Sequence, residues 1–88
     1  MCGIFGIVCG QEQPLGSILT EAGRRLSYRG YDSVGCATLV EGKLIDLRKD
    51  VGKVEDVAGL LGFDQMTGSR GIVQLRWATF GNSSMINA

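Results

Sequence analysis

Hydrophobic residues fall into short segments that are separated by glycine and polar residues. Within each segment the spacing of the hydrophobic residues indicates a strand or a helix. Residues 3–9 form a continuous apolar run rich in Ile, Phe and Val, which predicts a buried strand that ends at Gly10. Pro14 is expected in the first turn of a helix, because proline already has the helical φ angle. One apolar stripe indicates that helix, at Leu15, Ile18, Leu19, Ala22 and Leu26. Its opposite face carries Glu21, Arg24 and Arg25.

The middle of the chain predicts a β-hairpin. Residues 34–40 are apolar on both faces and residues 44–48 alternate between apolar and polar. Glu41 and Gly42 lie between these runs and suit a tight turn. The two runs are therefore predicted to pair as antiparallel strands.

The last third of the chain predicts a helix, a loop and a strand. Residues 53–61 have the pattern of a short amphipathic helix, residues 63–70 are polar and glycine-punctuated like a loop, and residues 71–78 resume a strand pattern. The resulting order predicts an α+β fold with a partly antiparallel sheet. Residues 79–88 contain nothing that closes an edge strand or caps a helix, so the chain is expected to stop in mid-domain.

Composition narrows the possible partners. Apolar residues make up 44% and charged residues 20% of the chain, which is typical of a folded domain. The charges of nine basic and nine acidic residues cancel, so the chain lacks the excess of positive charge that binds nucleic acid or an anionic membrane. The first ten residues are apolar, but they are too short to span a bilayer and lack a signal-peptide pattern. A small molecule or a protein surface is the expected partner.

Cysteine and histidine usage limits the chemistry. The three cysteines form no Cys-x-x-Cys pair and histidine is absent, which argues against a disulfide framework and a zinc site. This usage fits a reducing cytoplasm, and no metal or cofactor is predicted. A base for nucleophilic catalysis cannot be a histidine of this chain.

Cys2 is the candidate nucleophile. A small residue after Met1 permits removal of the methionine, which leaves a thiol and an α-amine on the same residue. That amine titrates near 7.7 to 8.0 in model systems, and a terminal amine can act as the base of its own nucleophile. The alternative is a small, chemically inert buried side chain. Position alone does not decide between the two.

Two further clusters carry chemistry or packing. Arg76 and Thr79 flank Trp77 at the predicted strand end, where a guanidinium can bind a carboxylate through two parallel hydrogen bonds. The alternative is a surface arginine stacked on Trp77. Residues 28–33 place aromatic, charged and hydroxyl groups on both sides of Gly30. The alternative to a functional role is a helix end at the glycine with an Arg–Asp pair nearby. Cys9 and Cys36 lie within apolar strand patterns and are assigned to core packing.

The motifs in combination resemble a known family. They are Met1-Cys2-Gly3-Ile4, Tyr28-Arg29-Gly30-Tyr31-Asp32-Ser33, Val51-Gly52-Lys53-Val54, Arg76-Trp77-Ala78-Thr79 and Asn87-Ala88. Their order and spacing are similar to those of class II glutamine amidotransferases, and most similar to the glutamine–fructose-6-phosphate aminotransferase branch. Residues 2–88 would then be the N-terminal part of a glutaminase domain that is truncated here.

The resemblance implies a fold and roles for named residues. The fold would be an N-terminal nucleophile hydrolase αββα sandwich, of which this chain is the N-terminal part. Cys2 would attack the side-chain amide of L-glutamine. Arg76 and Thr79 would hold the glutamine, and Trp77 would separate the glutamine pocket from the ammonia path. Ammonia would pass to an acceptor in a downstream domain or partner chain, with fructose 6-phosphate giving glucosamine 6-phosphate.

Some positions depart from the family pattern, and three readings stay open. The family has His where this chain has Phe80, and a His-Thr pair where it has Gln74-Leu75. The resemblance also places the oxyanion donors and an amine-binding Asp beyond Ala88, so the 88-residue chain alone is expected to be nearly inactive. The open readings are the aminotransferase just described, a stand-alone class II amidotransferase with another acceptor, and a non-catalytic fragment that binds glutamine or a partner.

Overall fold

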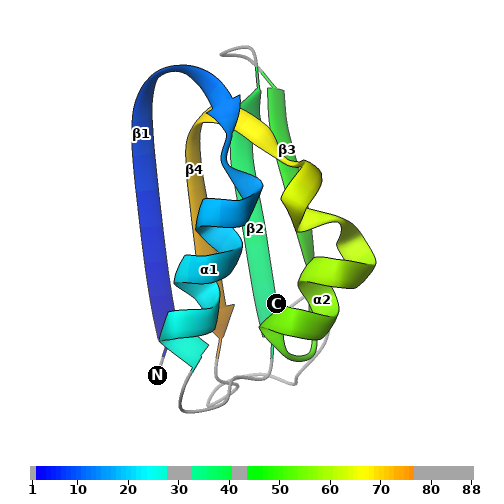
Figure 1. Ribbon diagram of the computed structural model, residues 1–88. Helices are drawn as coiled ribbons and strands as arrows, with labels where there is room; N and C mark the ends of the chain where they lie inside the picture. The colour runs from blue at the N-terminus through cyan, green and yellow to red at the C-terminus, as the bar shows by residue number, and fades with distance from the viewer. Residues whose placement is uncertain (1, 28–32, 41–43, 77–88) are drawn as a thin grey trace.

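The computed structural model describes residues 2–27, 33–40 and 44–76. Within these ranges the chain forms one sheet with helices on one side (Figure 1). The elements follow the order β1 (Cys2–Pro14), α1 (Gly16–Leu26), β2 (Ser33–Val40), β3 (Leu44–Val51), α2 (Val54–Leu61), the short 3-10 helix η2 (Phe63–Gln65) and β4 (Thr67–Arg76). The predicted succession of strand, helix, hairpin, helix and strand is confirmed.

The sheet has the strand order β1-β4-β2-β3, and all of its described pairings are antiparallel. β4 and β2 are the central strands, although β4 comes last in the chain. Figure 1 shows α1 and α2 packed on the same face of this sheet. The fold therefore has one covered and one open sheet face among the described residues.

The core lies between the sheet and the two helices. Alternate residues of the central strands point into it, as the period of a strand requires. Its fully buried side chains include Leu15, Leu19, Val34, Cys36, Phe63, Met66, Val73 and Leu75. Arg48 of β3 fastens α2 to the sheet, because its Nη1 donates to the carbonyl oxygens of Leu61 and Gly62 at 2.9 and 2.6 Å. Asp46 holds the same guanidinium through two bonds of 3.0 Å.

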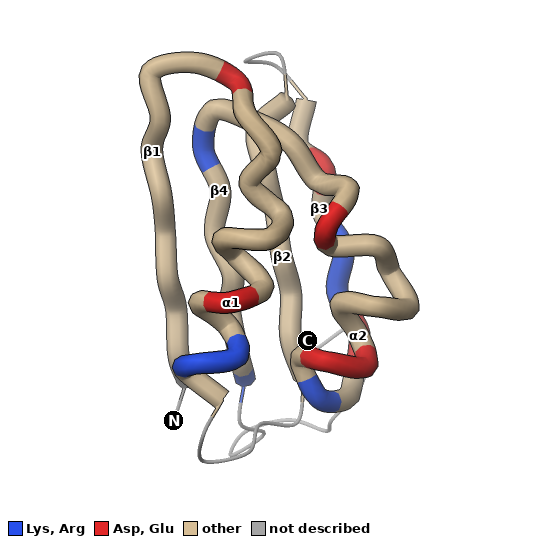
Figure 2. The backbone as a smooth tube through the Cα atoms, viewed as in Figure 1, with Lys and Arg blue, Asp and Glu red and all other residues tan. Residues whose placement is uncertain are grey.

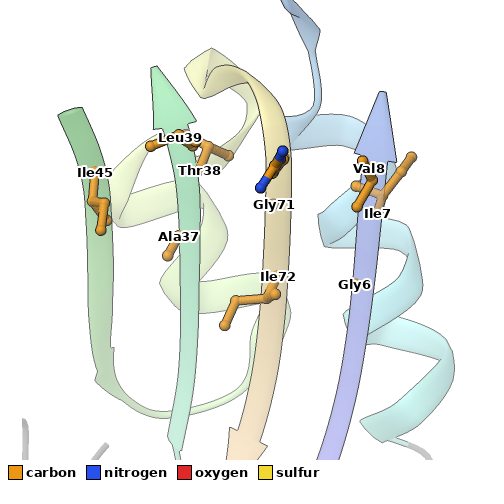
Figure 3. A pocket seen from close by; sticks show the side chains of 10 residues that line it. Gly6, Ile7, Val8, Ala37, Thr38, Leu39, Ile45, Gly71 and Ile72 are labelled. Carbon is orange, nitrogen blue, oxygen red and sulfur yellow. The ribbon is translucent and has the colours of Figure 1, made fainter. Parts of the chain in front are cut away.

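The opposite sheet face is apolar and open. Its register brings Ile4 and Val8 of β1, Ile72 of β4, and Ile45 and Leu47 of β3 to one side. Val8 is 76% and Ile45 is 71% exposed. Figure 3 looks onto this face and shows the helices behind the strands. Such a contiguous apolar surface is unusual for a soluble monomer and typical of a face that packs against another layer.

The predicted end of the first strand is wrong. β1 does not stop at Gly10 but continues to Pro14, which pairs with Thr67 after a shift of register between Val8 and Gln13. Pro14 is therefore the last strand residue and not a residue of the first helical turn, since α1 begins at Gly16. A proline is tolerated there because β1 lies at the edge of the sheet.

The predicted loop over residues 63–70 is also wrong. Residues 63–65 form η2, and β4 already begins at Thr67. Gly68 in this segment, and Gly71 just after it, serve close packing rather than turns. A Cβ on Gly68 would lie 2.7 Å from the carbonyl oxygen of Leu39, and one on Gly71 would lie 2.8 Å from Cδ1 of Leu19. The lack of a side chain at these two glycines allows β4 to pack close to β2 and α1.

The predicted stripe of α1 is confirmed in part. Leu15 and Leu19 are fully buried, while Ile18 is 44% exposed and Gly23 is buried instead. Glu21 faces outward and forms ion pairs with Arg24 and Arg25, as the pattern predicted. The hydrogen bond from Arg25 lowers the pKa of the Glu21 carboxyl below its usual range.

The predicted hairpin and second helix are confirmed. β2 pairs with β3 from Ser33 opposite Val51 to Val40 opposite Leu44, and the predicted turn at Glu41-Gly42 lies outside the described residues. α2 begins at Val54 and ends at Leu61, and Gly62 caps it with a φ of 67°, the left-handed conformation that favours glycine. No helix within the described ranges is long and apolar enough to cross a membrane.

Candidate active site

Four strand ends meet in one row at one end of the sheet, where Val51, the last residue of β3, pairs with Ser33. β1 begins at Cys2, β4 ends at Arg76 and β2 begins at Ser33. The ladder pairs Cys2 with Arg76, and pairs Arg76 with Ser33 on its other side. Opposite residues of an antiparallel pair have Cα atoms about 4.5 to 5.5 Å apart. Two of the residues that the sequence singled out for chemistry, Cys2 and Arg76, are thus direct neighbours, although they are the first and the last of the described residues.

The other sequence-predicted site residues cannot be placed. Trp77, Thr79 and Phe80 follow β4 and lie outside the described residues, as do residues 28–32 of the aromatic and charged cluster. Ser33, the last residue of that cluster, is described. The sequence reasoning gave it no role, although its membership of the cluster was a signal. It is 1% exposed, and its hydroxyl oxygen has no hydrogen-bond partner.

The two cysteines assigned to packing lie where the sequence predicted. Cys36 is fully buried in β2 and Cys9 is partly buried against the core. Burial raises the pKa of the Cys36 thiol to about 12, and the nearby Asp46 carboxylate adds to the effect. Because the thiolate is the reactive form of cysteine, Cys36 is chemically inert at neutral pH.

Alkylation should reveal this inertness. In the folded chain at pH 8, iodoacetamide is expected to leave Cys36 unmodified, since a thiol with a pKa of about 12 is protonated there. In denaturant the pKa returns to near 8.5 and the same reagent should modify Cys36 within minutes. Peptide mass spectrometry of the two samples measures the difference. Rapid labelling of Cys36 in the folded chain would contradict the buried position.

Two grooves on the described surface offer no comparable chemistry. A groove of about 410 Å³ crosses the open sheet face, and the side chains around it are apolar except for Arg70 and Thr38 (Figure 3). A second, polar groove of about 570 Å³ lies between α1 and α2 beside Glu21, Arg24 and Asp64. Neither is lined by Cys2 or Arg76. The row of strand ends is therefore the candidate active site.

Electrostatics do not point to a nucleic-acid or metal site. Figure 2 shows acidic and basic positions interspersed along the described backbone. Among the described residues, no group of three His, Cys, Asp or Glu side chains could hold a metal ion.

Comparison with known sequences gives relatives across the whole chain. No protein-family model matches it. A glutamine–fructose-6-phosphate aminotransferase (isomerizing) of Pyrobaculum aerophilum is 47% identical over the full chain, and enzymes of the same name are 46% identical in Shewanella oneidensis and 41% identical in Thermococcus kodakarensis. The chain spans only 15% of the Pyrobaculum protein and 14% of the other two.

A solved structure shares the fold. The glutamine phosphoribosylpyrophosphate amidotransferase from B. subtilis, complexed with ADP and GMP, superposes on 91% of this chain with a TM-score of 0.67. The match is 22% identical and takes up 17% of the amidotransferase chain. The likeness confirms the predicted α+β class and the N-terminal nucleophile hydrolase fold.

Proposed function

We infer, because the chain belongs to the class II glutamine amidotransferase family, that Cys2 attacks the side-chain amide of glutamine and Arg76 binds the substrate's α-carboxylate. The observation that carries the proposal is the pairing of Cys2 with Arg76 in the ladder between β1 and β4. Glutamine has a carboxylate at one end and an amide at the other. A nucleophile and a guanidinium on neighbouring strands match those two groups.

The terminal amine would supply the base. Once Met1 is removed, the α-amine of Cys2 accepts the thiol proton, and the thiolate attacks the amide carbon. The tetrahedral intermediate collapses as the C–N bond breaks, and the departing nitrogen takes a proton and leaves as ammonia. Water then cleaves the glutamyl thioester to glutamate and regenerates the thiol.

Further groups would complete the pocket. We assign Thr79 to the binding of the same substrate and Trp77 to the wall between the glutamine pocket and the path of ammonia, as the family resemblance implies. Oxyanion donors would come from outside this chain, so its 88 residues alone should be nearly inactive: loss of one such donor typically costs roughly 10²- to 10³-fold in rate. In this proposal residues 2–88 form the N-terminal part of a glutaminase domain that works in the cytoplasm with an acceptor domain or a partner chain.

The proposed acceptor is fructose 6-phosphate, which would give glucosamine 6-phosphate. The names of the relatives at 41–47% identity support this choice. A different acceptor is the second candidate, because Phe80 stands where the family has His. Formation of an aminated sugar phosphate by the full-length polypeptide that carries this sequence would separate the two.

Arg76→Lys tests the proposed site. In the full-length polypeptide, this change should raise the KM for glutamine roughly 10- to 100-fold, because an ammonium group cannot reproduce the planar two-point contact of a guanidinium with a carboxylate. Ammonia release against glutamine concentration measures the effect. Arg70→Lys, on the same strand but away from the row of strand ends, is the matched control and should leave KM unchanged. An unaltered KM in Arg76→Lys would remove Arg76 from the site.

A further inference from the structure

The hydroxyl of Ser33 is a buried polar group without a partner in the row of strand ends. Ser33 is 1% exposed and its Oγ makes no hydrogen bond. Buried hydroxyls are normally hydrogen-bonded, since an unsatisfied one loses its hydration and gains nothing in return. Such an exception calls for a physical reason, and the position of Ser33 beside the candidate site offers one.

The ladder places Ser33 next to the proposed carboxylate-binding arginine. Ser33 and Arg76 are direct partners between β2 and β4, and Cys2 is the partner of Arg76 on the far side. Side chains of directly opposite residues lie on the same face, with Cβ atoms about 4.5 to 5.5 Å apart. A guanidinium has five N–H donors, so it can bind a carboxylate through two of them and still donate a third to a neighbouring hydroxyl.

We propose that Ser33 is a positioning residue: its hydroxyl accepts a hydrogen bond from the Arg76 guanidinium and fixes the plane in which that guanidinium meets the α-carboxylate of glutamine. The inference rests on the proposed function and adds a residue to it. In the structure the Ser33 oxygen is unpartnered, so the bond forms when the guanidinium turns toward bound substrate. The bond helps substrate binding because, in the bound state, it gives the buried Ser33 hydroxyl a charged partner that it lacks in the free chain.

The test compares variants of the full-length polypeptide in ammonia release from glutamine. Ser33→Ala should raise the KM for glutamine about 10-fold, as expected for loss of a hydrogen bond to a charged group, with kcat within about 2-fold of wild type. Ser33→Thr keeps the hydroxyl and should restore KM. In an Arg76→Lys background, Ser33→Ala should have no further effect on KM, because its partner is already gone.

Thr38→Val is the matched control. Thr38 lies on the same strand, is 1% exposed and also has an unpartnered hydroxyl, but it pairs with Gly71 rather than with Arg76. Its replacement should leave KM unchanged, which separates the row of strand ends from a general effect of buried hydroxyls.

The outcomes distinguish this inference from the proposed function. An unchanged KM in Ser33→Ala, beside a wild type whose ammonia release depends on Cys2, overturns the role of Ser33 alone. A loss that Ser33→Thr fails to rescue, or that adds fully to Arg76→Lys, also overturns it, because a merely structural role behaves that way. A wild type without Cys2-dependent ammonia release overturns the proposed function and this inference with it.

Discussion

Ammonia release from glutamine by the full-length polypeptide is expected to fall on the order of 10⁵-fold when Cys2 is replaced by alanine. In the proposed mechanism the Cys2 thiolate forms the covalent intermediate, and neither of the other two cysteines is expected to take its place. Cys36 is buried and its pKa is raised to about 12, while Cys9 is packed against the core. An assay of ammonia from purified wild type and Cys2→Ala measures the effect.

Cys9→Ala is the matched control for this prediction. It removes a thiol from the same strand and should retain activity within about 3-fold, since Cys9 lies on the helix-covered side of the sheet. A form that retains Met1 should lose activity as completely as Cys2→Ala, because its α-amine is converted to an amide. Cys2→Ala with more than a tenth of wild-type activity would show that the nucleophile is another residue.

Gly16→Ala is expected to lower the stability of the 88-residue chain by about 3 kcal/mol or more. Gly16 is the first residue of α1, and a Cβ there would lie 1.8 Å from the carbonyl oxygen of Phe63. The backbone cannot easily yield, because the N–H groups of Leu15 and Gly16 both donate to the carbonyl oxygen of Met66 at 3.1 and 3.0 Å. Thermal unfolding should show a midpoint lower by more than about 10 °C.

Gly59→Ala provides the opposite result at a glycine of the other helix. Gly59 lies within α2, and a Cβ there meets nothing within 4 Å. Alanine should therefore stabilise α2 by about 0.5 to 1 kcal/mol, because it loses less conformational entropy than glycine on folding.

Equal midpoints for Gly16→Ala and wild type would mean that α1 does not approach η2 as closely as described.

The elements that the sequence predicted well are those whose pattern is local. Residues 34–40 and 44–48 pair across a short connection, and residues 53–61 combine helical spacing with a terminal glycine at Gly62. In each case neighbouring residues carry the whole signal. The structure confirms all three because tertiary contacts only reinforce what the local period prescribes.

The elements predicted wrongly are those that depend on distant contacts. Gly68 lies in a glycine-punctuated segment with the composition of a loop, but it belongs to the central strand β4. Glycine is needed there because the backbone of β2 approaches too closely for a larger residue. Pro14 is a residue type that is common at helix starts, but here it ends β1 and pairs in the sheet with Thr67, far along the chain. Sequence spacing does not carry that information.

In the candidate site, too, the sequence predicted what depends on local residues and missed what depends on distant contacts. Residue chemistry and family resemblance were sufficient to select Cys2 and Arg76 from the sequence. Their adjacency was not predictable, because it follows from the non-local pairing of β1 with β4. Ser33 was missed for a related reason: its lack of a hydrogen-bond partner is a property of the folded chain.

The pairing of β1 also fixes when the proposed active site can form during synthesis. Within the described residues β1 is hydrogen-bonded to β4 alone, and α1, β2, β3 and α2 lie between the two in the chain. A ribosome that adds about 5 to 20 residues per second needs several seconds to complete that intervening stretch. Throughout this interval β1 lacks its described partner, and under the proposed mechanism the N-terminus would be accessible to the aminopeptidase that removes Met1. The new terminal amine would then reach its place beside Arg76 only when β4 is complete.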